Sequence, residues 1–174
     1  QLPPSKTLAQ ILRNSIEQVR SVASHNKIEG KESGAGKVQR GGTATILREE
    51  LTAYVKDSGV DPSGLGRWSW YLLQGEEGLC TRVVTTYAPC GSAASRKETY
   101  YQQQVRYIKT KALKTNPRAM FWDDLLTQLR RWHSSGNRVI LMMDANEHIL
   151  NQALGKCLVV EATGLDLVEI YHKA

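Results

Sequence analysis

Apolar and polar positions follow a helical period near the start of the chain and a two-residue period after residue 40. Apolar residues lie at positions 8, 11, 12, 16, 19 and 22, which is the spacing of one helix face, so we expect a helix up to Val22. Residues 25–40 are polar and rich in glycine, with no apolar period. This composition predicts a flexible loop between the helix and the segments that follow.

Alternating apolar residues between Gly41 and Tyr87 predict a series of strands. Thr43–Leu47 favours a strand, positions 51, 53 and 55 are apolar between polar neighbours, and positions 68, 70 and 72 alternate again. Gly75–Gly78 has the glycine content of a tight turn, so Leu79–Tyr87 is expected to pair back as a hairpin. We expect the tryptophans at 68 and 70 to lie in the core, because inward-facing strand residues are usually packed.

Two helices and a last strand are predicted in the second half of the chain. The segment after Pro89 has a helical pattern, and Asn116–Pro117 has the residues favoured at the cap and the first position of a further helix. Gly136 is expected to end that helix, whose apolar stripe consists of Phe121, Leu125, Leu129 and Trp132. Val139–Met143 is a continuous apolar run too short for a helix, which predicts a fully buried strand ending at Asp144.

Hairpin strands followed by helices and another strand are typical of an α/β fold. We expect a mixed β-sheet sandwich flanked by helices, in a single domain over residues 1–174. The hydrophobic content of 41% and the charged content of 23% are ordinary for a globular protein, and no apolar run is long enough to span a membrane. Cys80, Cys90 and Cys157 are widely separated, which argues against a zinc site or a disulfide and favours an intracellular compartment, the nucleus included.

The net charge of +6 is concentrated in one segment. Residues 96–118 contain one acid, Glu98, and seven bases, which are Arg96, Lys97, Arg106, Lys109, Lys111, Lys114 and Arg118. Such a cluster is typical of a protein that binds the phosphate backbone of nucleic acid, with Tyr100, Tyr101 and Tyr107 available to stack on bases. The same pattern is equally typical of a solvated helix face whose tyrosines are buried, and both interpretations stay open.

The end of the last predicted strand carries a candidate site. Asp144 and Asn146 follow the apolar run, one residue apart, where strand ends of a parallel sheet deliver side chains to a ligand. A carboxylate can hold a hard cation such as Mg²⁺ or accept a proton, and an amide can donate to a phosphoryl oxygen. Asp and Asn also cap turns by bonding their own backbone, which is the structural alternative.

Two phrases in this order resemble a known superfamily. They are Val83–Pro89, a strand running into Tyr-x-Pro, and Leu141–Glu147, with a helical stretch between them. Together they resemble the endonuclease/exonuclease/phosphatase superfamily, which has the DNase I-like fold. The stretches 41–45 and 66–70 are similar to one branch, the endonuclease domains of non-LTR-type retroelements. The likeness extends from about Gly41 to Tyr171, so residues 1–174 are expected to form one domain of this kind.

The resemblance implies two packed mixed sheets flanked by helices and Mg²⁺-dependent cleavage of phosphodiesters in DNA. It implies that Asp144 holds the metal and orients or deprotonates the attacking water. Asn146 would contact the scissile phosphate, and the hydroxyl of Tyr87 would donate to it. These roles fit general chemistry, because a metal polarises the phosphoryl oxygen while fixed donors stabilise the developing charge.

The chain departs from the family pattern at several positions. Met143 stands where a Gly is usual, and Cys90 stands where an Asn is common. Alignment of Gln1 and Pro3 with the family's Gln-Glu-Pro motif places Leu2 at the metal-binding Glu. The catalytic His of the family is expected beyond residue 174, and none of the four histidines has metal-ligand spacing. The resemblance therefore implies a DNase I-like domain that is incomplete at both ends.

Three functional interpretations follow. The first is an endonuclease-like domain of a retroelement-type protein that is inactive as the isolated chain. The second is a non-catalytic nucleic-acid-binding or structural module derived from the same fold. The third is an ordinary α/β domain in which Asp-x-Asn occurs by chance. Unpaired sheet edges would need a cover, so missing segments of a parent chain, or another protein, are expected partners.

Overall fold

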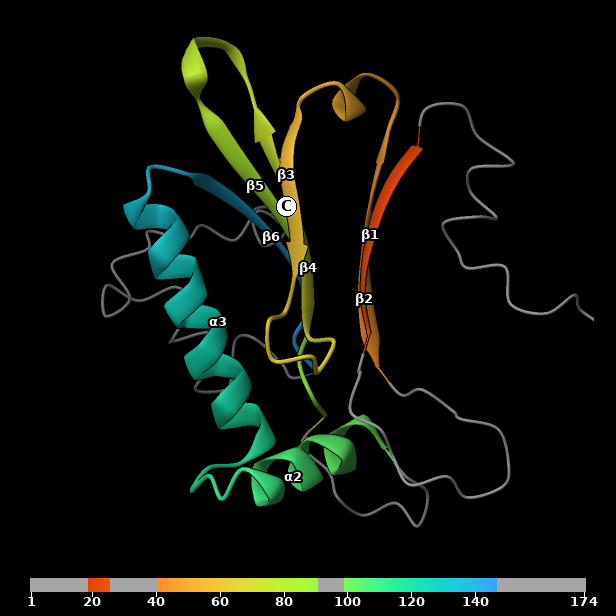
Figure 1. Ribbon diagram of the computed structural model, residues 1–174, viewed down its shortest axis with the longest axis vertical. Coiled ribbons are helices and arrows are strands. Elements are labelled where there is room, and N and C mark those ends of the chain that lie inside the picture. The colour runs from red at the N-terminus through yellow and green to blue at the C-terminus, as the bar shows by residue number, and fades with distance from the viewer. Residues whose placement is uncertain (1–18, 26–40, 91–98, 147–174) are drawn as a thin grey trace, which may run out of the picture.

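A computed structural model describes residues 19–25, 41–90 and 99–146 of the chain. Within these ranges the fold is mixed α/β, with a two-stranded sheet, a four-stranded sheet and two α-helices (Figure 1). One helix lies along one side of the larger sheet and the smaller sheet lies on the other side. The predicted fold class is thus confirmed at the level of a mixed sandwich with flanking helices.

The four-stranded sheet has the order β3-β4-β5-β6. Its strands are β3 (Val55–Val60), β4 (Trp68–Gln74), β5 (Cys80–Tyr87) and β6 (Arg138–Asp144). The first two pairings are antiparallel, and the hairpin predicted around Gly75–Gly78 joins β4 to β5. β5 and β6 are parallel, which requires a crossover, and the crossover contains both helices. As a result β5 and β6 end at the same edge of the sheet.

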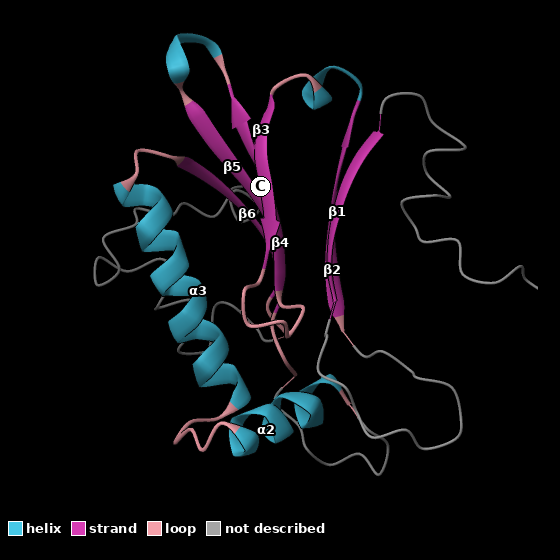
Figure 2. Cartoon of the chain, in the orientation of Figure 1, coloured by secondary structure: helices cyan, strands magenta, loops and turns pink. Residues whose placement is uncertain are grey.

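The two helices of the crossover are α2 (Tyr100–Thr110) and α3 (Pro117–Ser134). Figure 2 shows that α3 runs along the sheet, while α2 crosses the end of the molecule where β5 finishes. A capping box starts α2, in which the Thr99 side chain accepts from the Gln102 backbone N–H and the Gln102 side chain accepts from the Thr99 N–H. The predicted cap of α3 is confirmed, because the Asn116 side chain accepts from the N–H groups of Arg118 and Ala119.

The main apolar core lies between α3 and the larger sheet. The predicted helix stripe of Phe121, Leu125, Leu129 and Trp132 is buried there, against Trp68 and Val84 from the sheet. The prediction of a core role for Trp68 is therefore confirmed. Gly136 has a φ of +75° directly after the helix, as expected for a glycine that ends it.

The smaller sheet corrects the prediction for the first part of the chain. It pairs β1 (Val19–His25) antiparallel with β2 (Gly42–Arg48) over all seven residues of each strand. Val19 and Val22 are therefore in a strand, and the prediction of a helix reaching Val22 is wrong. Their spacing of three residues matches a helical period, but backbone pairing with β2 decides the conformation. Residues 1–18 and 26–40 lie outside the described residues, and His25 belongs to β1 rather than to the predicted loop.

Hydroxyl groups join the two sheets. The Thr45 hydroxyl of β2 lies 3.0 Å from the Ser69 hydroxyl of β4 and donates to the Thr85 hydroxyl of β5 at 2.9 Å. Leu47 and Tyr71 are also buried. The face between the sheets is therefore partly polar, unlike the apolar face under α3.

Two further strand predictions need correction. The alternation at positions 51–55 does not make a strand, because Glu49–Thr52 forms a 3-10 turn and β3 begins only at Val55. β6 is not fully buried, since Ile140 is 47% exposed and Met142 is 45% exposed. Only Val139, Leu141 and Met143, on the other face, pack toward the core under α3. An unbroken apolar run does not reveal which of its faces is covered.

Candidate functional site

The three residues predicted to act together lie at the ends of adjacent strands. Tyr87 and Asp144 are the last residues of β5 and β6 and are paired in the parallel register. The Ala88 N–H donates to the Asp144 carbonyl at 2.9 Å, and the Asn146 side-chain amide donates to the Ala88 carbonyl at 2.6 Å. We call Tyr87, Asp144 and Asn146 the strand-end site. Residues separated by 57 positions of sequence are thus brought together by the sheet register.

The Asp144–Asn146 segment is a tight turn. The Asn146 N–H donates to the Asp144 side chain at 3.0 Å, and Asn146 has a φ of +49°. Asn adopts this left-handed region more readily than most residues do. The capping role offered as the structural alternative is therefore present. It also turns the Asn146 side chain back toward β5, so capping and placement at the site arise from one conformation.

The Tyr87 hydroxyl lies 3.7 Å from the Cys90 thiol. Partial burial is the largest influence on the pKa of Tyr87 and raises it above its ordinary value. The Asn146 side chain donates to the phenolic oxygen and lowers this pKa. The neighbouring Cys90 and the negative charge of Asp144 raise it further. The net change is upward. The phenol therefore stays protonated near neutral pH and can donate a hydrogen bond to an anion.

The ring of Tyr100, the first residue of α2, packs against the ring of Tyr87. The two rings pack with centroids 5.4 Å apart at an angle of 44°. A methyl group at Gly41 would lie only 2.2 Å from the Tyr100 ring, and Gly41 has a φ of +74°, so glycine is required beside this ring. Tyr100 is 7% exposed, which favours the buried interpretation of this tyrosine over base stacking. Burial strongly raises its pKa, against the opposing charge of Arg67.

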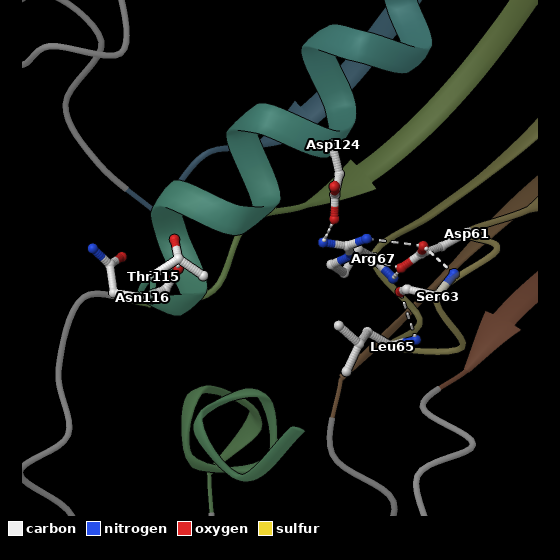
Figure 3. A network of polar contacts seen from close by, with 7 residues as sticks. All are labelled: Asp61, Ser63, Leu65, Arg67, Thr115, Asn116 and Asp124. Carbon is white, nitrogen blue, oxygen red and sulfur yellow. Dashed lines mark hydrogen bonds and ion pairs between the residues drawn. The ribbon is translucent and has the colours of Figure 1, made fainter. Parts of the chain in front are cut away.

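A network of ion pairs joins the turn before β4 to α3 (Figure 3). Arg67 donates to Asp61 twice, from Nε at 2.6 Å and from Nη2 at 3.0 Å, and to Asp124 on α3 from Nη1 at 2.7 Å. Burial alone would lower the pKa of Arg67, but the bonds and charges of Asp61 and Asp124 raise it above its ordinary value. The Arg67 carbonyl accepts from the Tyr87 N–H at 2.9 Å, so the network fixes the backbone of a site residue.

Sequence reasoning missed this network. Asp61 and Arg67 lie in the turn between β3 and β4, six residues apart, a separation that matches neither a helical nor a strand period. The turn is shaped by Asp61, whose side chain also accepts from the Ser63 N–H at 2.9 Å, while the Leu65 N–H donates to the Ser63 hydroxyl. The available signal was the Asp-Pro-Ser-Gly sequence, which is typical of a turn started by Asp.

The predicted nucleic-acid-binding residues fall into three groups. Arg96 and Lys97 lie outside the described residues. Four residues are exposed on α2 and the loop after it, namely Arg106, Lys109, Lys111 and Lys114. Arg118 differs from these, because it is only partly exposed and donates to two backbone carbonyls, those of Pro89 at 2.9 Å and Ala145 at 3.4 Å.

The side chains of the strand-end site fit Mg²⁺ in one specific way. Asp144 is exposed and supplies a carboxylate beside two side chains that could donate hydrogen bonds to a phosphate, Tyr87 and Asn146. Mg²⁺ commonly binds through one or two carboxylates, water and substrate phosphate, so Asp144 suits a metal that is shared with a substrate. In the described ranges, no three His, Cys, Asp or Glu side chains gather as a metal-binding group. Leu2, which the resemblance would place at a metal-binding Glu, lies outside those ranges.

No helix in the described part of the chain is long and apolar enough to cross a membrane. Comparisons with family models, with curated proteins and with solved structures found no match.

Proposed function

We propose that the protein binds the phosphodiester backbone of nucleic acid at the strand-end site, with the arrangement of a Mg²⁺-dependent endonuclease. The observation that carries this proposal is the convergence of Tyr87, Asp144 and Asn146 at adjacent strand ends. The resemblance to the DNase I-like superfamily supports the same proposal, since these are the residues to which it assigns roles.

Each side chain has a distinct role in this proposal. Asp144 holds Mg²⁺ together with substrate phosphate and orients the attacking water. Bound Mg²⁺ supplies a Lewis acid that polarises the phosphoryl oxygen. The neutral Tyr87 hydroxyl donates to a non-bridging oxygen. The Asn146 amide has two N–H groups; one donates to the Ala88 carbonyl, and the other, which faces the Tyr87 phenolic oxygen, would turn to the bound phosphate.

A non-catalytic binding module is the second candidate. The observation that favours it is the set of exposed lysines at 109, 111 and 114, at the end of α2 and in the loop that follows. Exposed cations attract the nucleic-acid backbone without requiring chemistry at the strand-end site. Substitution of Met and Cys for the usual Gly and Asn at positions 143 and 90 agrees with a domain that has lost catalysis.

Binding at the site is tested with Asn146→Asp. This change keeps the size of the side chain but puts a second negative charge beside Asp144 and Tyr87. We expect a loss of affinity for duplex DNA of about tenfold, the scale of one charge-assisted hydrogen bond. The matched control is Gln74→Glu, the same amide-to-acid change on an exposed residue at the far end of β4. Equal losses in both variants would argue against phosphate binding at this site.

Catalysis is tested by Mg²⁺-dependent nicking of supercoiled plasmid. The family departures predict binding without nicking above background for this chain. Nicking that disappears in Asp144→Ala but persists in Asp123→Ala, an exposed acid on α3, would establish the enzyme. Binding without nicking would support the module. If the protein neither binds nor nicks DNA, the third interpretation, an ordinary α/β domain, is the one that remains.

A further inference from the structure

We infer that Arg118 is a positioning residue that holds the two halves of the strand-end site together, an inference whose functional meaning rests on the proposed function. Its guanidinium donates to the carbonyl of Pro89, two residues after Tyr87, and to the carbonyl of Ala145, between Asp144 and Asn146. One side chain from α3 thus bridges the two segments that carry the site.

The bridge completes a set of bonds between these segments. The Ala88 N–H donates to the Asp144 carbonyl, and the Ala88 carbonyl accepts from the Asn146 side chain. The next carbonyl, that of Pro89, lies beyond the end of β5 and is bonded by Arg118 instead. The backbone N–H and carbonyl of Ala88 and the carbonyl of Pro89 are therefore bonded to β6, to the turn that follows it, or to α3.

The position of Arg118 on its helix is unfavourable for helix stability by itself. It is the second residue of α3, and a cation near a helix N-terminus opposes the helix dipole. The same place is well fixed, because Asn116 caps the Arg118 N–H and Pro117 restrains the first helical position. A cation at this unfavourable place in the helix is expected if its hydrogen bonds to Pro89 and Ala145 serve the site rather than the helix.

Arginine suits this bridge and lysine does not. The guanidinium presents donors in a planar fork, so two of its nitrogens can bond carbonyls on different segments at once. A lysine ammonium has the same charge but lacks this fixed fork. Arg118→Lys therefore removes the bridge while preserving charge, and Arg118→Gln removes both. Lys114→Gln, an exposed residue in the loop before α3, is the matched control for loss of charge alone.

The test measures amide hydrogen exchange by NMR at two site groups, the backbone N–H of Ala88 and that of Asn146. We expect exchange at both to accelerate at least tenfold in Arg118→Lys and Arg118→Gln, with no change in Lys114→Gln. Amides in the middle of β4, such as that of Trp70, should keep their wild-type rates. Unchanged exchange at both site amides would overturn the inference. Equal acceleration throughout the sheet would also overturn it, because it would show a general structural role.

The wild-type protein provides a second measurement that does not depend on the folding of any variant. An Arg118 guanidinium held by two carbonyls should give separate, slowly exchanging Nη proton signals, whereas a freely rotating one gives averaged signals. Averaged signals would contradict the bridge.

DNA binding separates this inference from the failure of the proposed function. A positioning role predicts that Arg118→Lys loses affinity with an unchanged dependence on salt. A direct phosphate contact, as the sequence suggested, predicts that Arg118→Lys retains affinity and that Arg118→Gln flattens the salt slope by about 0.9; that result would overturn the positioning role. If wild-type protein does not bind DNA but the exchange results hold, the bridge stands and the proposed function fails.

Discussion

Replacement of Asp61 by asparagine should destabilise the domain by about 3–5 kcal/mol, the usual cost of removing one partner from a buried ion pair. The Asp61 side chain is completely buried and that of Arg67 is 1% exposed. Four donors converge on the Asp61 carboxylate, which are the N–H groups of Ser63 and Arg67 and two nitrogens of the Arg67 guanidinium. Asparagine offers one acceptor oxygen, and its NH₂ group would face a donor.

The magnitude depends on how far Asp124 compensates. Its carboxylate bonds the same guanidinium at 2.7 Å, but its side chain is 47% exposed and is therefore screened by water. A pair of this kind contributes about 1 kcal/mol or less. Asp61→Asn thus leaves a buried cation with a half-exposed partner. Because domains typically unfold at a cost of about 5–15 kcal/mol, the variant should lose a large share of its stability.

Urea unfolding followed by tryptophan fluorescence and by circular dichroism measures the loss. Asp124→Asn removes the other partner of Arg67 and should cost about 1 kcal/mol, while Asp123→Asn changes an exposed neighbour on α3 and serves as the control for helix propensity. The reasoning would be refuted by an Asp61→Asn variant that is no less stable than Asp124→Asn. A variant of normal stability would show that the buried pair contributes nothing net, as some buried pairs do.

Two further predictions concern Tyr100 and the exposed lysines. The Tyr100 hydroxyl is buried and makes no hydrogen bond of good geometry among the described residues, although the Gln104 side chain lies close enough to oppose the rise in its pKa, so Tyr100→Phe should leave stability at pH 8 unchanged or raised. In wild-type protein the unfolded tyrosine ionises near pH 10 while the folded one stays protonated, so Tyr100 should lower the free energy of unfolding by about 1.4 kcal/mol between pH 8 and pH 11. Alkaline urea titrations should show a loss that is about 1.4 kcal/mol smaller in Tyr100→Phe than in Tyr107→Phe, because the raised pKa of Tyr87 is common to both variants. Replacement of Lys109, Lys111 and Lys114 by Gln should flatten the slope of log affinity for DNA against log salt by up to about 2.7. An unchanged slope in anisotropy titrations would assign these lysines to a solvated surface.

Elements whose signals are local can be predicted from the sequence. Asn116, Pro117 and Gly136 bracket α3 because capping and positive φ depend on single residues, and the stripe from Phe121 to Trp132 follows from the helical period. The alternation in β4 and the glycines of the turn after it predicted the β4–β5 hairpin correctly. Strand ends at Tyr87 and Asp144 were also predicted, because each follows a run of strand-forming residues.

Which of these elements contact one another depends on long-range packing and cannot be predicted from local signals. Val19 and Val22 suit a helix or a strand, and pairing with β2 makes them a strand. The parallel register places Tyr87 beside Asp144. The position of α3 lets Arg118, which the sequence presents only as one of seven cations, donate to the carbonyls of Pro89 and Ala145. Asp61, Arg67 and Asp124 form a network with partners up to 57 residues apart. Such contacts depend on long-range packing and on the burial of charge, whereas propensity and periodicity describe only neighbours along the chain.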